Sequence, residues 1–251
     1  MLLSIITVTY YSKYVIETIE NIRRECGFPV SDYEIIIVDN ASQPLIQEYA
    51  QKNSLIYIKN KRNLGFGAAM NKGIQHAKGE YIALLNPDIL ITKQTFPTII
   101  TYLKKNKNVG IIGPKLLAIN NALQYSCKRF PDILTLIIRR FSFVFLVHYF
   151  RKRTEYYEMH DYDHATPQHV DWLSGAFLVG RKEVFTEFLF DERFFLYFED
   201  VDICRRIGQK YDIMYFPNAV ATHYAAHGSK KSAKLFFYHL SSMMQYFYKY
   251  K

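Results

Sequence analysis

The 251-residue sequence has only three cysteines, and none is spaced as a metal ligand or as part of a disulfide framework. Cys26, Cys127 and Cys204 stand alone, without a Cys-x-x-Cys pair, which argues against a zinc ribbon or a redox motif. Three small buried thiols in a reducing cytoplasm are the expectation. Stability must then come from a hydrophobic core, which a chain of this length with 49% hydrophobic residues can form.

Hydrophobic runs of membrane-spanning length are also missing. The longest apolar stretch, 133–150, is interrupted by Arg139, Arg140 and His148, which argues against a spanning helix. The first ten residues carry no basic region and no cleavage site, and their β-branched residues favour a buried strand over a signal peptide. We therefore expect no export signal and a cytoplasmic protein.

Acidic residues are absent from two basic, aromatic segments of a chain whose formal net charge is +9. Segment 133–153 contains five Lys or Arg, segment 228–251 contains five Lys, and neither contains Asp or Glu. Basic residues among bulky apolar ones suit a peripheral contact with an anionic membrane, here the inner face of the cell membrane. A helix that packs its aromatic face on the protein and leaves its lysines in water is an equally good interpretation. Nucleic acid is not an expected partner, because no nucleic-acid-binding motif accompanies the charge.

The first half of the chain alternates short β-branched runs with helical patterns. Strands are expected at 3–9, 34–38, 55–59, 81–85 and 109–113, with helices at about 13–24, 44–52, 67–77 and 93–105. This alternation predicts an α/β fold with a mostly parallel, Rossmann-like sheet flanked by helices. Ligands of such sheets bind at the carboxyl ends of the strands, here the first, second and fourth. After Pro114 we expect strands at 123–127, 176–179 and 219–222, a helix at 201–210 and a long aromatic helix at the C-terminus.

Polar groups follow these strand ends. Asp39 follows strand 34–38, where it can accept a hydrogen bond from the N3–H of a pyrimidine or cap the next helix. Asp88, in Asn86-Pro87-Asp88, follows strand 81–85 and suits a divalent ion that bridges phosphate oxygens. In the segment 63–67, Asn-Leu-Gly-Phe-Gly, two glycines at a loop-to-helix junction permit close approach of a ligand, although an ordinary turn explains them too.

Seven fragments, in order along the chain, carry a family resemblance. They are Thr-Val-Thr-Tyr at 7–10, Val-Asp-Asn-Ala-Ser at 38–42, the segment 63–71, Asn-Pro-Asp at 86–88, Trp-Leu-Ser-Gly-Ala at 172–176, the segment 194–202 and His-Tyr-Ala-Ala-His-Gly at 223–228. From residue 3 to about 229 the chain resembles inverting family 2 glycosyltransferases of the GT-A fold, most closely the bacterial rhamnosyltransferase-like members. The resemblance implies one domain, 1–251, with a nucleotide-sugar-binding half (1–113) and an acceptor-facing half (114–251) that ends in the terminal helix.

The resemblance also implies site residues. The UDP or dTDP part of a nucleotide sugar would contact Thr9, Tyr10, Asp39, Asn63, Gly65, Gly67, Asn71 and Asn86. Mn²⁺ or Mg²⁺ would be bound by Asp88 and His223, although the usual Asp-x-Asp pair begins with Asn86 here, which should weaken the metal site. Asp200 would be the catalytic base, and Trp172, Gly175, Glu199 and His227 would contact the substrate or acceptor. The alternatives are a structural His223, a core Trp172 and a capping role for the acidic residues at 199–202.

The implied reaction is inverting transfer of rhamnose or another hexose from a dTDP- or UDP-sugar to a saccharide acceptor. A lipid-linked glycan of cell-surface polysaccharide synthesis is the expected acceptor. Two other classes compete with this enzyme. A sugar nucleotidyltransferase is disfavoured because Thr9-Tyr10-Tyr11-Ser12 lacks the glycine-rich loop expected after the first strand, whereas a catalytically silent sugar-nucleotide-binding module is consistent with Asn86.

Overall fold

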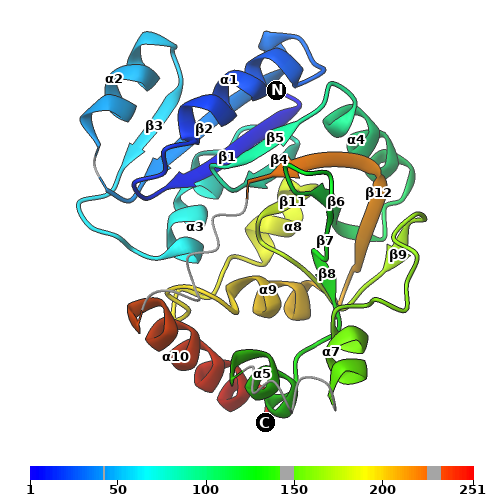
Figure 1. Cartoon of the computed structure of the whole chain (residues 1–251). Helices are drawn as coiled ribbons and strands as arrows, with labels where there is room; N and C mark the ends of the chain where they lie inside the picture. Colours follow the sequence, from blue (N-terminus) through cyan, green and yellow to red (C-terminus); the bar gives the residue numbers. More distant parts are fainter. Residues whose placement is uncertain (42, 142–149, 225–232) are drawn as a thin grey trace.

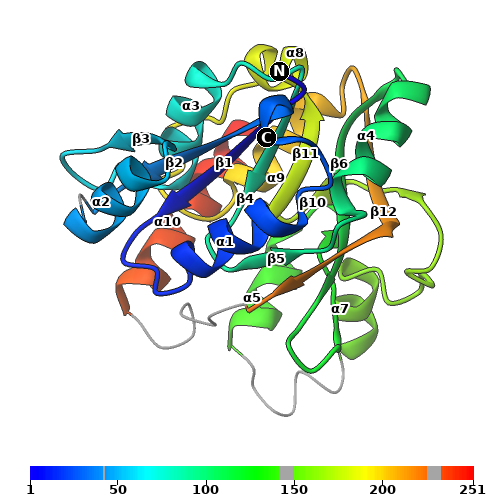
Figure 2. The same ribbon diagram turned by 90° about the horizontal axis from the view of Figure 1, so that it is seen from above.

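The computed structural model describes residues 1–41, 43–141, 150–224 and 233–251. A mixed sheet in the order β3-β2-β1-β4-β11-β6-β12-β5 forms its centre, with β7 added to β6 and β9 to β12 (Figures 1 and 2). The strands are β1 (Leu3–Thr9), β2 (Tyr33–Asp39), β3 (Ile56–Lys59), β4 (Tyr81–Leu85), β5 (Ile89–Ile91), β6 (Val109–Leu117), β7 (Leu123–Gln124), β8 (Cys127–Lys128), β9 (Gln168–His169), β10 (Trp172–Leu173), β11 (Phe177–Arg181) and β12 (Asp212–His223). The helices are α1 (Val15–Glu25), the 3₁₀ turn η1 (Val30–Asp32), α2 (Pro44–Lys52), α3 (Phe66–His76), α4 (Thr95–Lys105), α5 (Ile133–Phe141), α7 (Arg151–Tyr157), α8 (Lys182–Glu187), α9 (Glu199–Ile207) and α10 (Ala233–Lys249).

The first four strands in the sheet order are parallel, as the alternation of strands and helices predicts. Thr7 of β1 pairs with Ile37 of β2 on one side and with Leu85 of β4 on the other. β11 then runs antiparallel between β4 and β6, so strands from both sides of residue 113 share one sheet. Because β1 lies between β2 and β4, Asp39 and the segment after Leu85 reach the same edge of the sheet.

Side-chain alternation along the strands builds the two layers of the core. In β1 and β2, Ile5, Ile35 and Ile37 face the side covered by α1, α2 and α4, where Ile19 and Phe96 are fully buried. Ile6, Ile36 and Val38 face the other side, which is covered by α3, α8 and α9. The period of two in a strand buries both faces of this sheet, which explains why its strands are continuous apolar runs.

The second half departs from the expectation in three places. The expected strand 123–127 is divided into β7 and β8, which belong to different sheets. β12 begins at Asp212 rather than at 219, and its register against β6 shifts between Phe216 and Val220. α9 begins at Glu199, two residues before the expected start.

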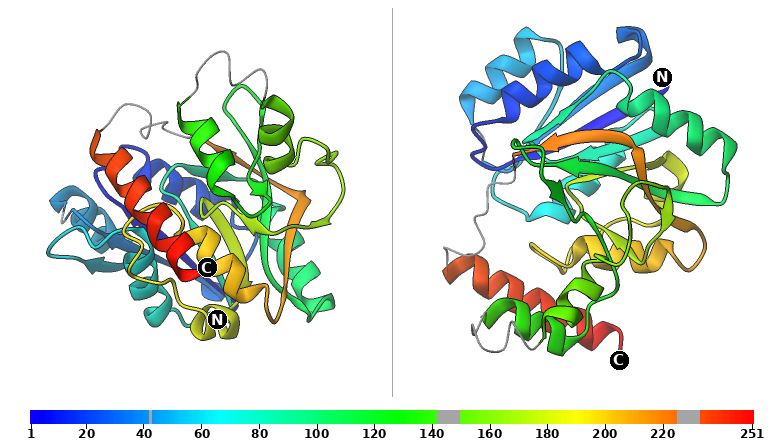
Figure 3. Two further views of the ribbon diagram at one scale, coloured as in Figure 1. Left: turned by 90° about the horizontal axis from the view of Figure 1, so that it is seen from below. Right: turned by 45° about the vertical axis from the view of Figure 1, so that its right-hand side comes forward.

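The described part of the C-terminal segment is the helix α10, and its inner face packs on the protein (Figure 3). Tyr246 is fully buried. Asp202, also fully buried, accepts hydrogen bonds from Lys249 Nζ at 2.6 Å, the Tyr250 hydroxyl at 2.7 Å and Arg206 Nε at 2.8 Å. A buried carboxylate needs such partners, since an unpaired charge inside a protein is costly. The packing alternative for this segment is therefore observed.

The basic residues of segment 133–153 are also largely engaged. Arg139 lies 2.6 Å from Glu158, Arg151 2.6 Å from Glu155, and Arg153 2.8 Å from Asp132. These acids stand just outside the acid-free segment in sequence but beside it in space. Among the residues that the structure describes, no helix is both long enough and apolar enough to pass through a bilayer.

Candidate active site

A cleft of about 500 Å³ opens at the carboxyl ends of β1 and β4. Five of the sequence-predicted residues line it, namely Tyr10, Asn63, Gly65, Asn86 and Asp88. Asn40, Phe66, Phe195, Leu196 and the segment 11–14 complete its walls. The structure thus brings the strand ends and the glycine loop together at the edge where open α/β sheets bind ligands.

The glycine loop is held in a fixed shape by side-chain amides. Asn63 Oδ1 accepts the Gly65 N–H at 2.9 Å, and Asn40 Nδ2 donates to the Gly65 carbonyl at 3.0 Å. Gly65 has a φ of +89°, and a Cβ at this position would lie 2.3 Å from the Phe195 carbonyl oxygen. The first residue of α3, Phe66, donates its N–H to that same oxygen at 2.9 Å. This N–H group at the start of α3 is therefore bonded within the protein and is not available to a ligand. Gly65 is therefore required for the loop to meet the segment that carries Phe195.

Gly65→Ala should lower the free energy of unfolding by about 1–3 kcal/mol, because alanine is strained at positive φ. Nucleotide binding should weaken as well, since the clash would displace Phe195 from the cleft wall. Urea denaturation and nucleotide titration measure the two effects. Gly208→Ala is the matched control, because Gly208 has a φ of −61° and its new Cβ would approach no atom closer than 3.1 Å. Equal stability of the two variants would contradict the argument.

Asp39 is fully buried and does not line the cleft. Its carboxylate accepts the N–H groups of Ala41 and Gln43, each at 2.7 Å, and the Tyr57 hydroxyl at 2.8 Å. These bonds hold the turn that leads into α2, while the helix itself, which begins at Pro44, has no side-chain cap among the described residues. A contact of Asp39 with a nucleobase stays a prediction.

Three other predicted nucleotide contacts lie beside the cleft rather than in its lining. Thr9 is buried, and its hydroxyl has no hydrogen-bond partner among the described residues. Gly67 packs on Phe190, whose Cβ is 2.9 Å from the position a Gly67 Cβ would take. Asn71 exchanges two 2.9 Å hydrogen bonds with the backbone of Phe190. Gly67 and Asn71 thus fasten α3 to the loop that precedes Phe195.

The side chains of Asp88 and His223 lie close together at the cleft edge of the sheet. His223 Nε2 lies 3.3 Å from Asp88 Oδ1. On the other side of the ring, Nδ1 lies 2.8 Å from Gln124 Oε1, while Gln124 Nε2 donates to the His223 carbonyl at 2.9 Å. With this amide orientation Nδ1 donates to Gln124 Oε1, and Nε2 faces the Asp88 carboxylate.

Two acceptors at 3.3 Å repel one another unless a cation or a second proton lies between them. The pair therefore fits a divalent ion, with Gln124 orienting the histidine from behind as in many metal sites. Among residues 1–41, 43–141, 150–224 and 233–251 no cluster of three His, Cys, Asp or Glu could hold a metal. Further ligands would come from phosphate and water, as is usual for Mg²⁺ at nucleotide sites.

Hydrogen bonds between neighbouring residues link Asp200 to the edge of the sheet that carries Asp88. Asn86 donates its N–H to the Ala176 carbonyl at 2.9 Å, and the neighbouring Gly175 N–H donates to Asp200 Oδ2 at 3.0 Å. Val201 N–H donates to Asp200 Oδ1 at 2.9 Å. Burial nevertheless raises the pKa of Asp200 above its usual 3.8, against these hydrogen bonds and the nearby positive charge of Lys128. A carboxylate with a raised pKa is a stronger base for proton transfer.

Glu199 differs from its neighbour. It is buried, and its Oε2 has no hydrogen-bond partner among the described residues. Burial, followed by the charge of Asp200, raises the pKa of Glu199 well above the usual range. Of the two adjacent carboxyls, Glu199 is therefore the one whose charged form burial disfavours more.

If Asp200 is the base, transfer should lose rate toward acid pH with a midpoint above 3.8, because protonation removes the base form. The rate should rise as pH increases through the pKa of Asp200 and then level off. A profile of kcat/KM against pH at saturating Mn²⁺ measures this. An acid limb that persists unchanged in Asp200→Asn would assign the limb to another group.

The remaining acceptor-side residues are only partly brought to the site. Trp172 is buried in the core, where its indole N–H donates to the Arg129 carbonyl at 2.8 Å, so the core alternative is observed. His227 lies outside the described residues. Lys128, which pairs with Trp172 between β8 and β10, holds its ammonium 5.0 Å from the indole centroid. Burial lowers the pKa of Lys128 to about 8.

Some site residues carried no signal in the sequence. Gln124 reaches His223 only because β7 and β12 both pair with β6. Phe195 and Leu196 lie in the segment 194–202, which carries the family resemblance, but no contact with the cleft was predicted for them. They enter the cleft from a segment whose next two residues, Tyr197 and Phe198, have φ of 70° and 67°. Such left-handed turns at non-glycine residues cluster at functional sites.

Comparison with solved structures defines the fold as that of GT-A glycosyltransferases. Residues of this chain match TarS 1–349 of S. aureus with a TM-score of 0.61 and 16% identity, over 89% of this chain and 60% of TarS. GalNAc-T7, solved with UDP, GalNAc and Mn²⁺, matches with a TM-score of 0.67 and 16% identity, over 88% of this chain and 43% of its own.

The chain belongs to glycosyl transferase family 2, whose model matches residues 4–189. Rhamnosyltransferase WbbL of Escherichia coli is 26% identical over 94% of this chain and 88% of WbbL. The N-acetylglucosaminyl-diphospho-decaprenol L-rhamnosyltransferase of Mycobacterium tuberculosis is 26% identical over 80% of this chain and 68% of that protein. An uncharacterized glycosyltransferase of Methanocaldococcus jannaschii is 35% identical, but the chain covers only 40% of its length.

Proposed function

We propose that this glycosyltransferase moves rhamnose, or another hexose, from a dTDP- or UDP-sugar to a saccharide acceptor with inversion. The observation that supports the proposal is that Asp88 and Asp200 are linked through neighbouring residues: Asn86 N–H donates to the Ala176 carbonyl, and Gly175 N–H donates to Asp200. An inverting transfer needs both groups at opposite ends of one reacting bond.

In this mechanism, Asp200 accepts the proton of the acceptor hydroxyl as the hydroxyl oxygen attacks the anomeric carbon. The bond from that carbon to the diphosphate breaks, and the nucleoside diphosphate leaves. Asp88 and His223 would hold Mn²⁺ or Mg²⁺, which neutralises charge on the leaving diphosphate. Gly175 orients Asp200 through its N–H, and burial disfavours a second negative charge on Glu199 beside the base.

The choice of donor is supported by the relatives. Two of them are named rhamnosyltransferases, and solved neighbours contain UDP or, in the mannosyltransferase PcManGT, GDP-Man and Mn²⁺. In the cleft, the exposed ring of Tyr10 and the side chain of Asn63 are available to a nucleoside.

The proposed acceptor is a glycan carried on a membrane lipid, in cell-surface polysaccharide synthesis, with the protein peripheral at the inner face. The mycobacterial relative is named for a diphospho-decaprenol acceptor.

Donor turnover tests the function directly. We expect dTDP-rhamnose or a UDP-hexose to bind by calorimetry and to be hydrolysed slowly with added Mn²⁺, with the sugar released at inverted configuration by NMR. Binding without any turnover would instead support a silent sugar-nucleotide-binding module, the alternative that Asn86 favours.

A further inference from the structure

The outer side of α5 and α10 exposes large apolar side chains. Its members are Ile133, Leu134 and Ile137 of α5 and Phe237, Met244 and Tyr248 of α10, with exposed fractions from 44% for Ile137 to 79% for Tyr248. We call these six residues the α5–α10 face. Figure 1 shows both helices along the bottom of the molecule, at the opposite end from α1 and α2.

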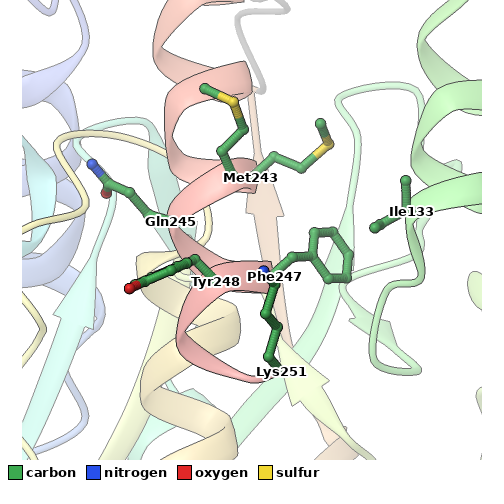
Figure 4. Close-up of a pocket in the computed structure, with 7 residues that line it drawn as sticks. Ile133, Met243, Gln245, Phe247, Tyr248 and Lys251 are labelled. Carbon is green, nitrogen blue, oxygen red and sulfur yellow. The ribbon is translucent and has the colours of Figure 1, made fainter.

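A groove of about 520 Å³ runs within this face (Figure 4). Ile133 lines it from α5, and Met243, Met244, Phe247, Tyr248 and Lys251 line it from the C-terminal segment. Methionine side chains adapt their shape easily, which suits a groove that accepts flexible hydrocarbon.

The inward sides of the same two helices are already packed. Leu136 and Ile138 of α5 and Tyr246 of α10 are buried in the core. A surface helix normally places polar residues opposite its buried stripe, so helices that are apolar on both sides need a second apolar environment.

Charge around the face favours one kind of environment. Neither α5 nor α10 contains an acidic residue. Arg139 and Lys249 are paired with buried or half-buried acids, whereas Lys234 and Lys251 form no ion pair with the described residues and lie over the rings of Tyr238 and Tyr248. An apolar face with lysines and tyrosines at its margin matches the boundary between headgroups and hydrocarbon of an anionic bilayer.

We propose that the α5–α10 face is the membrane-contacting surface and that anionic bilayer lipid is its occupant. The inference rests on the proposed function in so far as a lipid-linked acceptor gives the enzyme a reason to be at the membrane. Because most of the bases in the two segments are paired internally or lie outside the described residues, the contact is chiefly apolar. In the described part of the C-terminal segment, Lys234 and Lys251 are the two lysines that form no ion pair with the described residues. If each contributes about fivefold in affinity, membrane binding depends only modestly on salt.

The same helix connects this face to the active site. Ser242 of α10 donates to the Leu196 carbonyl at 2.9 Å, and the rings of Tyr238 and Phe195 lie 4.4 Å apart. Leu196 and Phe195 line the nucleotide cleft. Docking of α10 on a bilayer would therefore hold the cleft one helix away from the membrane surface, within reach of a lipid-linked saccharide.

Vesicle co-sedimentation of the full chain tests the proposal. The vesicles consist of phosphatidylcholine with about 30% phosphatidylglycerol, which gives an anionic surface. Met244→Asp combined with Tyr248→Asp should weaken binding at least about tenfold, because charged groups are excluded from hydrocarbon. The matched control is Leu45→Asp on α2, where Leu45 is 65% exposed, and it should bind like the unaltered protein. Phe237→Asp serves as a second variant if the double variant does not fold by circular dichroism.

Three outcomes would overturn the proposal. They are no binding by the unaltered protein, equal losses in Leu45→Asp, or a dimer in sedimentation velocity that Met244→Asp with Tyr248→Asp dissolves, which would make a second copy the occupant. A fourth outcome, a loss of binding above about 100-fold between 0.1 and 0.5 M salt, would show that the contact is electrostatic and not apolar. Donor hydrolysis in detergent-free solution separates the two proposals: its absence in the unaltered protein counts against the transferase function, whereas vesicle binding does not depend on it.

Discussion

Asp200→Asn is expected to lower kcat for sugar transfer by about 10²–10⁴-fold, the range a positioned base contributes, while donor affinity stays nearly unchanged. The amide has almost the shape of the carboxylate and can still accept the Gly175 N–H, but it cannot take a proton from the acceptor hydroxyl. A loss confined to turnover identifies an interaction made in the transition state. Single-turnover kinetics and donor titration by calorimetry measure the two quantities separately.

Glu199→Gln is the matched control for that experiment. Glu199 is adjacent and equally carboxylic, but burial raises its pKa and favours the neutral form, which the amide of glutamine resembles. We expect transfer to change little in this variant. If Glu199→Gln is the more damaging of the two, the base assignment must move to Glu199. If Asp200→Asn loses donor affinity and turnover in proportion, Asp200 belongs to the donor site.

The first half of the fold was predictable because each element carries its own local signal. The β-branched runs that become β1, β2 and β4 are buried on both faces, and the amphipathic stretches between them become α1, α2 and α3. Helix α2 was predicted with the bounds it has, Pro44–Lys52, because proline at the first turn and lysine in the last are strong end signals.

β12 was predicted only in part because its sequence contradicts its structure locally. Pro217 and Asn218 stand in the middle of the strand, where the pattern indicates a turn. The sheet accommodates them through the register shift between Phe216 and Val220. Pairing with β6 and β5, far away in the sequence, outweighs the local preference, and periodicity does not carry that information.

The residues of the candidate site were likewise predictable only in part. Asp88 and Asp200 were identifiable because their fragments carry the family resemblance. Gln124 was not, since its only distinction is a contact with His223, 99 residues away. In the basic segments the sequence indicates more free charge than the structure has, because Arg139, Arg153 and Lys249 pair with acids that the sequence does not place beside them.

Asp88→Ala is expected to reduce metal-dependent transfer by about 10³-fold or more, the effect of several kcal/mol of lost charge stabilisation at the leaving diphosphate. Asp88 carries the only carboxylate in the segment 86–88, because the preceding position of the usual acidic pair is Asn86. Without the Asp88 carboxylate, His223 would be the single protein ligand of the proposed pair that remains for the ion. The fold should persist, since among the described residues the Asp88 side chain pairs with His223 alone, while the Asp88 backbone carbonyl still accepts the Tyr224 N–H.

Mn²⁺ titration in the presence of UDP, followed by electron paramagnetic resonance, measures the metal site independently of turnover. Glu48→Ala on α2 is the control for loss of an exposed carboxylate and should leave both quantities unchanged. Gln124→Leu should weaken Mn²⁺ binding by about 10–100-fold, because the ring of His223 would lose the acceptor that holds its proton on Nδ1. The order of effects, Asp88→Ala above Gln124→Leu above Glu48→Ala, follows from distance to the ion. Full Mn²⁺ affinity in Asp88→Ala would mean that the ion is bound elsewhere and that the pair of Asp88 and His223 is an ordinary ion pair.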